Sequence, residues 1–200
     1  ISLAASLSGR QLRAGLAEII KYGVIKDPRL FSYLEKNFRK ILKRDKRALE
    51  LVVARSSAIK AAVVAIDEFD NKGRRVMLNF GHTVGHAVEA ASGYGEGYNH
   101  GEAIAVGMVA AAAMSQKLGL LDRGAAARIE RLIKNTGLPV KIKGLKLSQI
   151  LRSLAHDKKF MGQKNRFVLP TCVGSVKAVA NIPDRIVKEI AKTGKPVAGF

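Results

Sequence analysis

Three of the four histidines of this chain lie between residues 82 and 100. His82 and His86 are four positions apart, and residues with that spacing lie on one face of a helix, so both imidazoles can point into one pocket. His100 follows a short stretch rich in glycine and tyrosine. Neutral imidazole is a good zinc ligand and a base that titrates near physiological pH, so this cluster predicts a metal or proton-transfer site.

Glycines stand beside these histidines, at Gly81, Gly85, Gly101 and Gly107. A glycine inside a helix costs roughly 1 kcal/mol relative to alanine. The ordinary alternative, a pair of surface or core histidines without a metal, gives no reason for this cost. The glycines therefore indicate the close approach of a ligand or of a second helix.

The composition is typical of one globular domain, because 200 residues that are 48% apolar suffice for a proper core. The longest apolar run, residues 103–114, is shorter than the ~20 residues needed to cross a bilayer, so we expect no membrane segment. The single cysteine, Cys172, cannot form an internal disulfide, which favours a cytoplasmic location. The chain begins at Ile1 without a basic leader, so we expect the natural protein to extend further toward its N-terminus.

The formal net charge of +19 raises nucleic-acid binding as an option. The basic residues, however, are spread over residues 36–47, 123–146 and 185–192, and no aromatic single-strand platform or base-reading motif accompanies them. We therefore do not expect a nucleic-acid partner. We interpret the densest cluster as a solvated helix face, and the field would also favour an anionic substrate. That cluster comprises Lys36, Arg39, Lys40, Lys43, Arg44, Lys46 and Arg47.

Helical spacing of apolar residues dominates the sequence and predicts a mainly α, multi-helix, bundle-like domain over residues 1–200. The alanine-rich segment 102–118 is apolar on most sides, which is typical of a buried central helix. Two short strands around Gly174, residues 166–170 and 175–180, predict a small C-terminal β-ribbon, and residues 70–73 predict a turn. The expected helices cover residues 11–24, 28–35, 43–66, 74–91, 102–118, 122–135, 148–155 and 184–191.

Four motifs, in order along the chain, carry a resemblance to a known family. They are RAGLAEIIKYG at 13–23, NFGHTVGHAVE at 79–89, HGEAIAVGM at 100–108, and DKK at 157–159 followed by Gly162 and RFVLP at 166–170. Together they closely resemble the C-terminal, mainly helical domain of 3-dehydroquinate synthase. The family's N-terminal nucleotide-binding domain, with its glycine-rich phosphate loop, has no counterpart in this sequence.

The resemblance implies conversion of a phosphorylated acidic sugar, 3-deoxy-arabino-heptulosonate 7-phosphate, to 3-dehydroquinate and phosphate in the shikimate pathway of aromatic amino-acid synthesis. It implies NAD and a divalent metal, usually zinc, with cobalt as an alternative. The implied sequence is transient oxidation of a ring hydroxyl, loss of phosphate, re-reduction, ring opening and aldol closure. Oxidation matters because the new ketone acidifies the neighbouring carbon. The resemblance further implies a homodimer in the complete enzyme and no turnover by this chain alone.

Carried over residue by residue, the resemblance makes Glu18, His82 and His100 the metal ligands. One carboxylate and two imidazoles leave open positions for substrate, so this is a catalytic rather than a structural zinc set. Lys21 lies one helical turn from Glu18 and should face the same pocket, where its ammonium can hold a substrate carboxylate or an oxyanion.

The resemblance also assigns substrate contacts to Lys60, Arg75, Asn79 and His86. Arg75 suits bidentate binding of a carboxylate, Asn79 suits a hydroxyl or phosphate, and His86 suits proton transfer or phosphate contact. For Lys60, simple solvation is the alternative.

Further positions follow from the same comparison. Lys158 and Lys159, for which simple solvation is again the alternative, are expected to bind an anion, and which of the two points inward stays open. We expect Glu89 and Glu102 to make helix-end or ligand-supporting contacts rather than to bind metal, and His156 to be a surface residue. The cofactor should pass beside Leu3, Ala4, Ala5 and Ser6, although Ser6-Leu7-Ser8 departs from the family's usual Thr-Leu-Pro.

Three other functions compete with this interpretation. A sister sugar-phosphate cyclase would keep the metal ligands and NAD chemistry but alter the groups that recognise the substrate carboxylate. A metal-dependent polyol dehydrogenase would not need the motif at residues 157–170. A non-enzymatic basic module that binds RNA or acidic proteins would have no need of the metal ligands, and its affinity would depend on salt.

Overall fold

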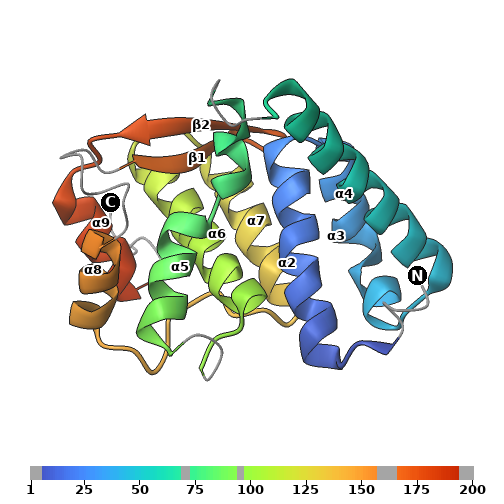
Figure 1. Cartoon of the computed structure of the whole chain (residues 1–200), viewed down its shortest axis with the longest axis horizontal. Coiled ribbons are helices and arrows are strands. Elements are labelled where there is room, and N and C mark those ends of the chain that lie inside the picture. The colour runs from blue at the N-terminus through green and yellow to red at the C-terminus, as the bar shows by residue number, and fades with distance from the viewer. Residues whose placement is uncertain (1–5, 69–72, 94–96, 157–165, 194–200) are drawn as a thin grey trace.

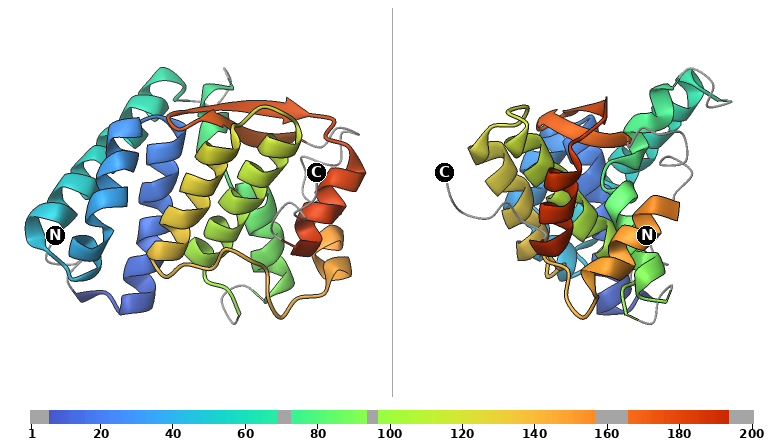
Figure 2. Two further views of the ribbon diagram at one scale, coloured as in Figure 1. Left: turned by 180° about the vertical axis from the view of Figure 1, so that it is seen from behind. Right: turned by 90° about the vertical axis from the view of Figure 1, so that its left-hand side faces the viewer.

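The computed structural model describes residues 6–68, 73–93, 97–156 and 166–193. Within these ranges the chain forms eight α-helices, one 3₁₀ helix and one two-stranded antiparallel sheet, which confirms the mainly α prediction. The helices lie side by side, and the ribbon crosses one end of them (Figures 1 and 2). The elements are α2 (Gly9–Ile25), α3 (Pro28–Leu42), α4 (Lys46–Ile66), η1 (Arg74–Asn79), α5 (His82–Ala91), α6 (His100–Lys117), α7 (Arg123–Asn135), α8 (Leu147–His156), β1 (Arg166–Cys172), β2 (Ser175–Ala180) and α9 (Asp184–Thr193).

Capping side chains fix where the site-bearing helices begin. Ser8 and Gln11 form a reciprocal capping box at the start of α2, and Asn99 and Glu102 form the same box at the start of α6. Asp27 caps α3, because its side chain accepts hydrogen bonds from the amides of Arg29 and Leu30. That helix continues to Leu42, beyond the expected end at residue 35, because its later apolar residues also face the core.

Helix α6 is the centre of the molecule, and residues 103–115 are all buried. It packs against α2, α5, α7, α9 and β1. This confirms the prediction of a buried central helix from the alanine-rich sequence. Because α6 begins at His100, its contacts with α2 and α5 decide where the histidine cluster lies.

Close contact between helices explains two of the glycines in α6. A Cβ atom on Gly107 would lie 1.9 Å from the carbonyl oxygen of Gly81, and one on Gly101 would lie 2.3 Å from that of Ala14. Both neighbours are backbone atoms that cannot move independently of their own helix or loop. Of the two explanations for the glycines, the structure supports the approach of a second segment of chain at these positions.

The prediction of a single helix at residues 74–91 is wrong. Residues 74–79 form the 3₁₀ helix η1, and α5 begins only at His82. Between them Gly81 adopts a left-handed backbone with φ of 80°, which interrupts a right-handed helix. A Cβ atom there would lie 2.7 Å from Cγ of Met108, so contact with α6 also requires this glycine. His82 and His86 nevertheless share α5.

The ribbon pairs Arg166 with Ala180 and Val168 with Ala178 in antiparallel register. It is fixed to the helices by backbone contacts, since the amide of Gly174 donates to the carbonyl of Val24 at 2.8 Å. Of the expected turn at residues 70–73, the first three residues lie outside the described part of the chain.

The seven lysines and arginines of the basic cluster at residues 36–47 are all exposed, as the sequence predicts. They occupy the second half of α3, the connection after it and the start of α4. None of the helices in the described ranges is both long and apolar enough to cross a bilayer.

Candidate metal centre

Three helices bring Glu18, His82 and His100 together. Glu18 comes from α2, and each histidine is the first residue of its helix, α5 or α6. Nε2 of His82 lies 3.8 Å from Oε1 of Glu18, and Nε2 of His100 lies 3.9 Å from the same oxygen. One ligand atom from each residue lies within 4.8 Å of the other two. The structure thus collects the three residues that the family resemblance implies as ligands.

The oxygen at the centre of this cluster fits a cation. Oε1 of Glu18 is buried and has no hydrogen-bond partner in the described part of the chain, whereas Oε2 is paired with Nζ of Lys21 at 2.6 Å. A buried carboxylate oxygen without a partner is costly. It faces two imidazole nitrogens, and this donor set of one oxygen and two nitrogens suits zinc.

Hydrogen bonds on the other ring nitrogens aim both imidazoles. Nδ1 of His82 lies 3.1 Å from the carbonyl oxygen of Phe80, so it donates a hydrogen bond to that oxygen. Nδ1 of His100 lies 3.2 Å from Oε2 of Glu89 and donates in the same way. In the neutral form of each ring, Nε2 then carries no proton and faces Glu18, which is the form that binds metal. Glu89 therefore contacts a candidate ligand, and its role in supporting that ligand stays a prediction.

Burial, and to a smaller extent the positive charge of Lys21, lower the pKa of His82 to about 4. The hydrogen bond to Phe80 and the charge of Glu18 oppose this shift. The imidazole is consequently neutral at physiological pH. A neutral ring can coordinate a metal without first losing a proton.

Lys21 belongs to the same cluster. Its side chain is only 5% exposed and forms the ion pair with Glu18. A buried lysine needs such a partner, because an isolated ammonium is strongly disfavoured away from water. The structure therefore places the ammonium beside the candidate ligands, as its spacing from Glu18 predicts.

His86 lies at the edge of the cluster. Its ring centroid is 5.2 Å from that of His82 and 6.1 Å from that of His100. The residue is exposed, unlike His82, whose side chain is 13% exposed. His86 is thus placed where solvent or a substrate can reach it.

No contact within the described residues joins Lys60, Arg75 or Asn79 to the candidate metal ligands. Arg75 in η1 directs Nη1 to the carbonyl oxygen of Glu68 at 3.2 Å, and its backbone amide donates to Asp67. Asn79 is half-buried at the end of η1, and Lys60 is exposed on α4. Their roles in substrate binding stay predictions.

Several other predicted positions have outcomes of different kinds. Lys158, Lys159, Leu3, Ala4 and Ala5 lie outside the described residues, as does the side chain of His156, and the cofactor role of Ser6, which is exposed, stays a prediction. Glu102 makes the expected helix-end contact, and it also accepts two hydrogen bonds from Arg10, at 2.8 and 2.6 Å.

Sequence reasoning missed the carbonyl of Phe80 as the group that orients His82, and it missed Arg10 as the partner of Glu102. A backbone carbonyl carries no sequence signal, and Arg10 lies 92 positions from Glu102. Only the packing of α2 and α6 brings that second pair together.

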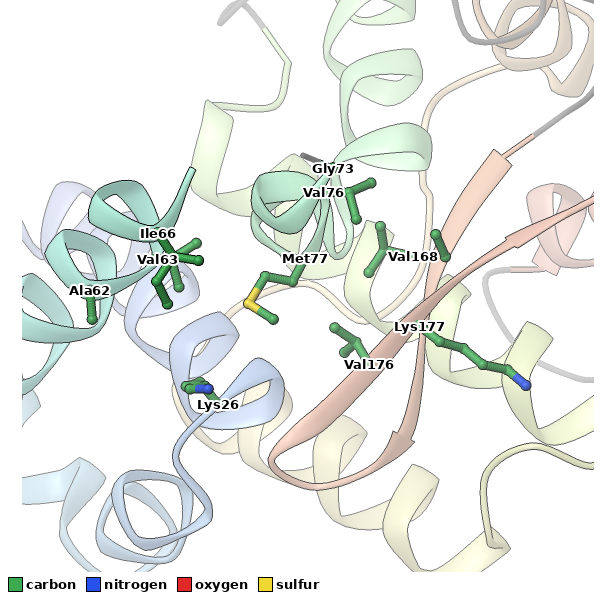
Figure 3. A pocket seen from close by; sticks show the side chains of 11 residues that line it. Lys26, Ala62, Val63, Ile66, Gly73, Val76, Met77, Val168, Val176 and Lys177 are labelled. Atoms are coloured by element: carbon green, nitrogen blue, oxygen red, sulfur yellow. The ribbon is translucent and has the colours of Figure 1, made fainter. Parts of the chain in front are cut away.

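A separate pocket of about 240 Å³ lies between the end of α4, η1 and the ribbon (Figure 3). Its lining is mostly apolar and includes Val63, Met77 and Val176. No residue of the metal cluster lines it. This pocket is therefore distinct from the candidate metal centre.

A family model described as 3-dehydroquinate synthase C-terminal matches residues 15–160. A 3-dehydroquinate synthase of Caldanaerobacter subterraneus subsp. tengcongensis is 44% identical over 187 residues, covering 94% of this chain and 52% of that protein. Another, of Desulforamulus reducens, is 47% identical over 180 residues, covering 90% of this chain and 50% of that protein. The chain thus spans about half the length of these curated relatives.

Two solved structures share the fold. The 2-epi-5-epi-valiolone synthase ValA of Streptomyces hygroscopicus subsp. jinggangensis, with NAD+ and Zn2+ bound, matches with a TM-score of 0.84 and 26% identity over 95% of this chain and 52% of that one. A 2-deoxy-scyllo-inosose synthase, complexed with carbaglucose-6-phosphate, NAD+ and Co2+, matches with a TM-score of 0.82 and 24% identity over 94% of this chain and 53% of that one. The match of the family model over most of the sequence, with the same fold in these structures, shows that the chain belongs to the 3-dehydroquinate synthase C-terminal family.

Proposed function

We propose that residues 1–200 form the metal- and substrate-binding half of a 3-dehydroquinate synthase. The reaction is conversion of 3-deoxy-arabino-heptulosonate 7-phosphate to 3-dehydroquinate and phosphate. The observation that carries this proposal is the buried Oε1 of Glu18, which has no hydrogen-bond partner in the described residues and faces Nε2 of two histidines. The 44% and 47% identities to 3-dehydroquinate synthases support it further.

Glu18, His82 and His100 would hold a zinc ion, and their donor atoms suit that metal. When bound, zinc polarises a coordinated substrate oxygen and NAD+ accepts and returns a hydride. The related valiolone synthase, whose structure contains both NAD+ and Zn2+, supports the same pair of cofactors here.

The remaining groups bind substrate and move protons. The ammonium of Lys21, buried beside Glu18, attracts a substrate oxyanion or carboxylate into the cluster. The exposed imidazole of His86 can take a proton from the carbon beside the transient ketone, or contact the phosphate. Arg75 offers a planar pair of donors to the carboxylate. The net charge of +19 favours the arrival of a phosphorylated acid.

A sister sugar-phosphate cyclase is the second candidate, because the structural relatives include a valiolone synthase. The valiolone synthase is 26% identical to this chain, whereas the dehydroquinate synthases reach 47%. The higher identity favours the dehydroquinate synthase function over the sister cyclase. Lys21 and Arg75 also provide cationic groups for a substrate carboxylate. A polyol dehydrogenase would give no role to the motif at residues 157–170. A basic binding module would give no role to the cluster of Glu18, His82 and His100.

The test is made in the complete enzyme with Arg75→Lys and His82→Ala. Arg75→Lys should lower kcat/KM for the heptulosonate phosphate without changing bound zinc, because lysine cannot make the bidentate contact. His82→Ala should lose zinc and activity together. The kcat/KM of both variants is also measured with a carboxylate-free sugar phosphate. Equal losses on both substrates in Arg75→Lys, or a wild-type preference for the carboxylate-free sugar, would replace this proposal with the sister cyclase.

We also propose that these 200 residues alone release no phosphate from the substrate, because hydride transfer requires NAD+ held beside the reacting carbon. Adding the other half of the enzyme should restore turnover. Phosphate release by the isolated chain at an enzyme-like rate would contradict this. From the family resemblance, the complete enzyme would be a cytoplasmic homodimer, and the lone cysteine Cys172 fits that compartment.

A further inference from the structure

A second group of potential metal ligands adjoins the first. One ligand atom each from His86, Glu89 and His100 lies within 4.8 Å of the other two. His86 and Glu89 are three positions apart on α5, so they lie on one face of that helix. His100 begins α6 and belongs to both groups. The second group has the same chemistry as the first, with two imidazoles and one carboxylate.

The two groups use opposite sides of the His100 ring. Its Nε2 faces Glu18, at 3.9 Å, and its Nδ1 faces Oε2 of Glu89, at 3.2 Å. The rings of His86 and His100 are tilted by 34° with centroids 6.1 Å apart. A cation on the Nδ1 side would therefore lie next to Glu89, away from the place between Glu18 and His82, and one ligand atom of His86 lies within 4.8 Å of those of Glu89 and His100.

Exposure distinguishes the two groups. His86 is exposed, and the side chain of His100 is 49% exposed, so an ion can reach them from solvent. Exposed side chains lose conformational entropy when an ion orders them. The second group also requires Nδ1 of His100, and this nitrogen carries the proton of the hydrogen bond to Glu89. Both effects make its affinity lower than that of the Glu18 group.

We propose that His86, Glu89 and Nδ1 of His100 form a second, weaker site for a zinc-class divalent ion, filled when metal is in excess. The ion replaces the proton between Nδ1 of His100 and Glu89, and that proton is released to solvent. Filling the site also occupies His86. If the proposed function holds, excess zinc inhibits the enzyme, because His86 is then lost for proton transfer or phosphate contact.

Cobalt(II) alone is the probe for this site, titrated into the complete chain with bound metal measured by equilibrium dialysis and the coordination spectrum followed. Wild type should bind two ions in two separate steps. His86→Ala should keep the tight step and lose the weak one, whereas His82→Ala should weaken the tight step and keep the weak one. Circular dichroism checks that each variant retains its helices.

A matched pair of glutamate variants refines the test. Glu89→Gln should weaken the second step at least about tenfold, whereas Glu50→Gln, an exposed glutamate of α4, should leave it unchanged. One bound ion at millimolar cobalt, or two ions in His86→Ala, would overturn the second site. Two bound ions without dehydroquinate formation would support the second site and contradict the proposed function. One bound ion in an enzyme that forms dehydroquinate would support the proposed function and contradict the second site.

Discussion

The floor of the candidate site, Glu18, Lys21 and His82, differs from two residues with predicted substrate contacts, Lys60 and His86, which we call the predicted rim. In the floor the side chains of Lys21 and His82 are 5% and 13% exposed and have fixed partners. Both rim residues are exposed. The contrast indicates that this chain by itself positions Glu18 and His82, two of the three candidate ligands.

The floor depends on how closely α5 and α6 approach. Gly81 and Gly107 allow backbone contact where any Cβ atom would overlap. That contact sets the distance between His82 and His100, which begin the two helices. The rim residue Lys60 lies on α4, which packs on α2, α3 and η1 instead. A change at the helix contact should therefore affect the floor first.

Gly107→Ala should have the largest effect. The new Cβ atom would lie 1.9 Å from the carbonyl oxygen of Gly81, so α5 and α6 must separate. We expect a loss of roughly 3 kcal/mol or more in the free energy of unfolding, together with weaker zinc binding. Urea unfolding and zinc titration measure both.

Gly15→Ala is the matched control for that change. Gly15 is an exposed residue of α2, and an added Cβ atom would have nothing within 4 Å. It should stabilise the chain by up to about 1 kcal/mol, because alanine is the better helix former. Wild-type stability and zinc binding in Gly107→Ala would contradict the dependence of the floor on helix contact.

Glu89→Gln should have an intermediate effect. Glu89 accepts a hydrogen bond from Nδ1 of His100, and loss of a group that orients a ligand typically costs about 10–100-fold in metal affinity. The first zinc should therefore bind more weakly than in wild type but more tightly than in His82→Ala. Competition with a chromogenic chelator gives the three affinities. If Glu89→Gln bound this first ion as tightly as wild type, Glu89 would not orient His100.

Arg10→Met should have the smallest effect, and one that depends on pH. The hydrogen bonds from Arg10 hold the pKa of Glu102 below its ordinary value of 4.5. A lowered pKa in the folded state contributes stability above the ordinary value, and this stability is lost as pH falls through the folded value.

The stability difference between wild type and Arg10→Met should therefore be largest near neutral pH and shrink below the ordinary pKa of Glu102. Urea unfolding at neutral and acidic pH measures it, and added salt should reduce it at neutral pH because the pair is at the surface. A difference that stayed constant over this range would show that the charge of Glu102 does not carry the interaction.

Local patterns predicted most of the fold, because helix spacing and capping residues act within a few positions of one another. The alanine-rich α6 is the clearest example. The break before α5 was missed, since the left-handed backbone of Gly81 follows from contact with Met108, which lies far along the sequence. Long-range packing is not visible in a local pattern.

The candidate site was predicted unevenly for the same reason. The spacing of His82 and His86 indicates a shared face by itself, whereas the assignment of Glu18 came only from the family resemblance. Physical grounds for Glu18 appear once α2 packs on α6 and leaves its Oε1 buried between two imidazoles. The pattern around Glu18 contains no sign of that environment.

Anomalous diffraction at the zinc absorption edge, from crystals of this chain grown with one equivalent of zinc, tests the central claim most directly. We expect a single strong peak among Oε1 of Glu18, Nε2 of His82 and Nε2 of His100. The absence of a peak there, or a peak found only between His86 and Glu89, would contradict it.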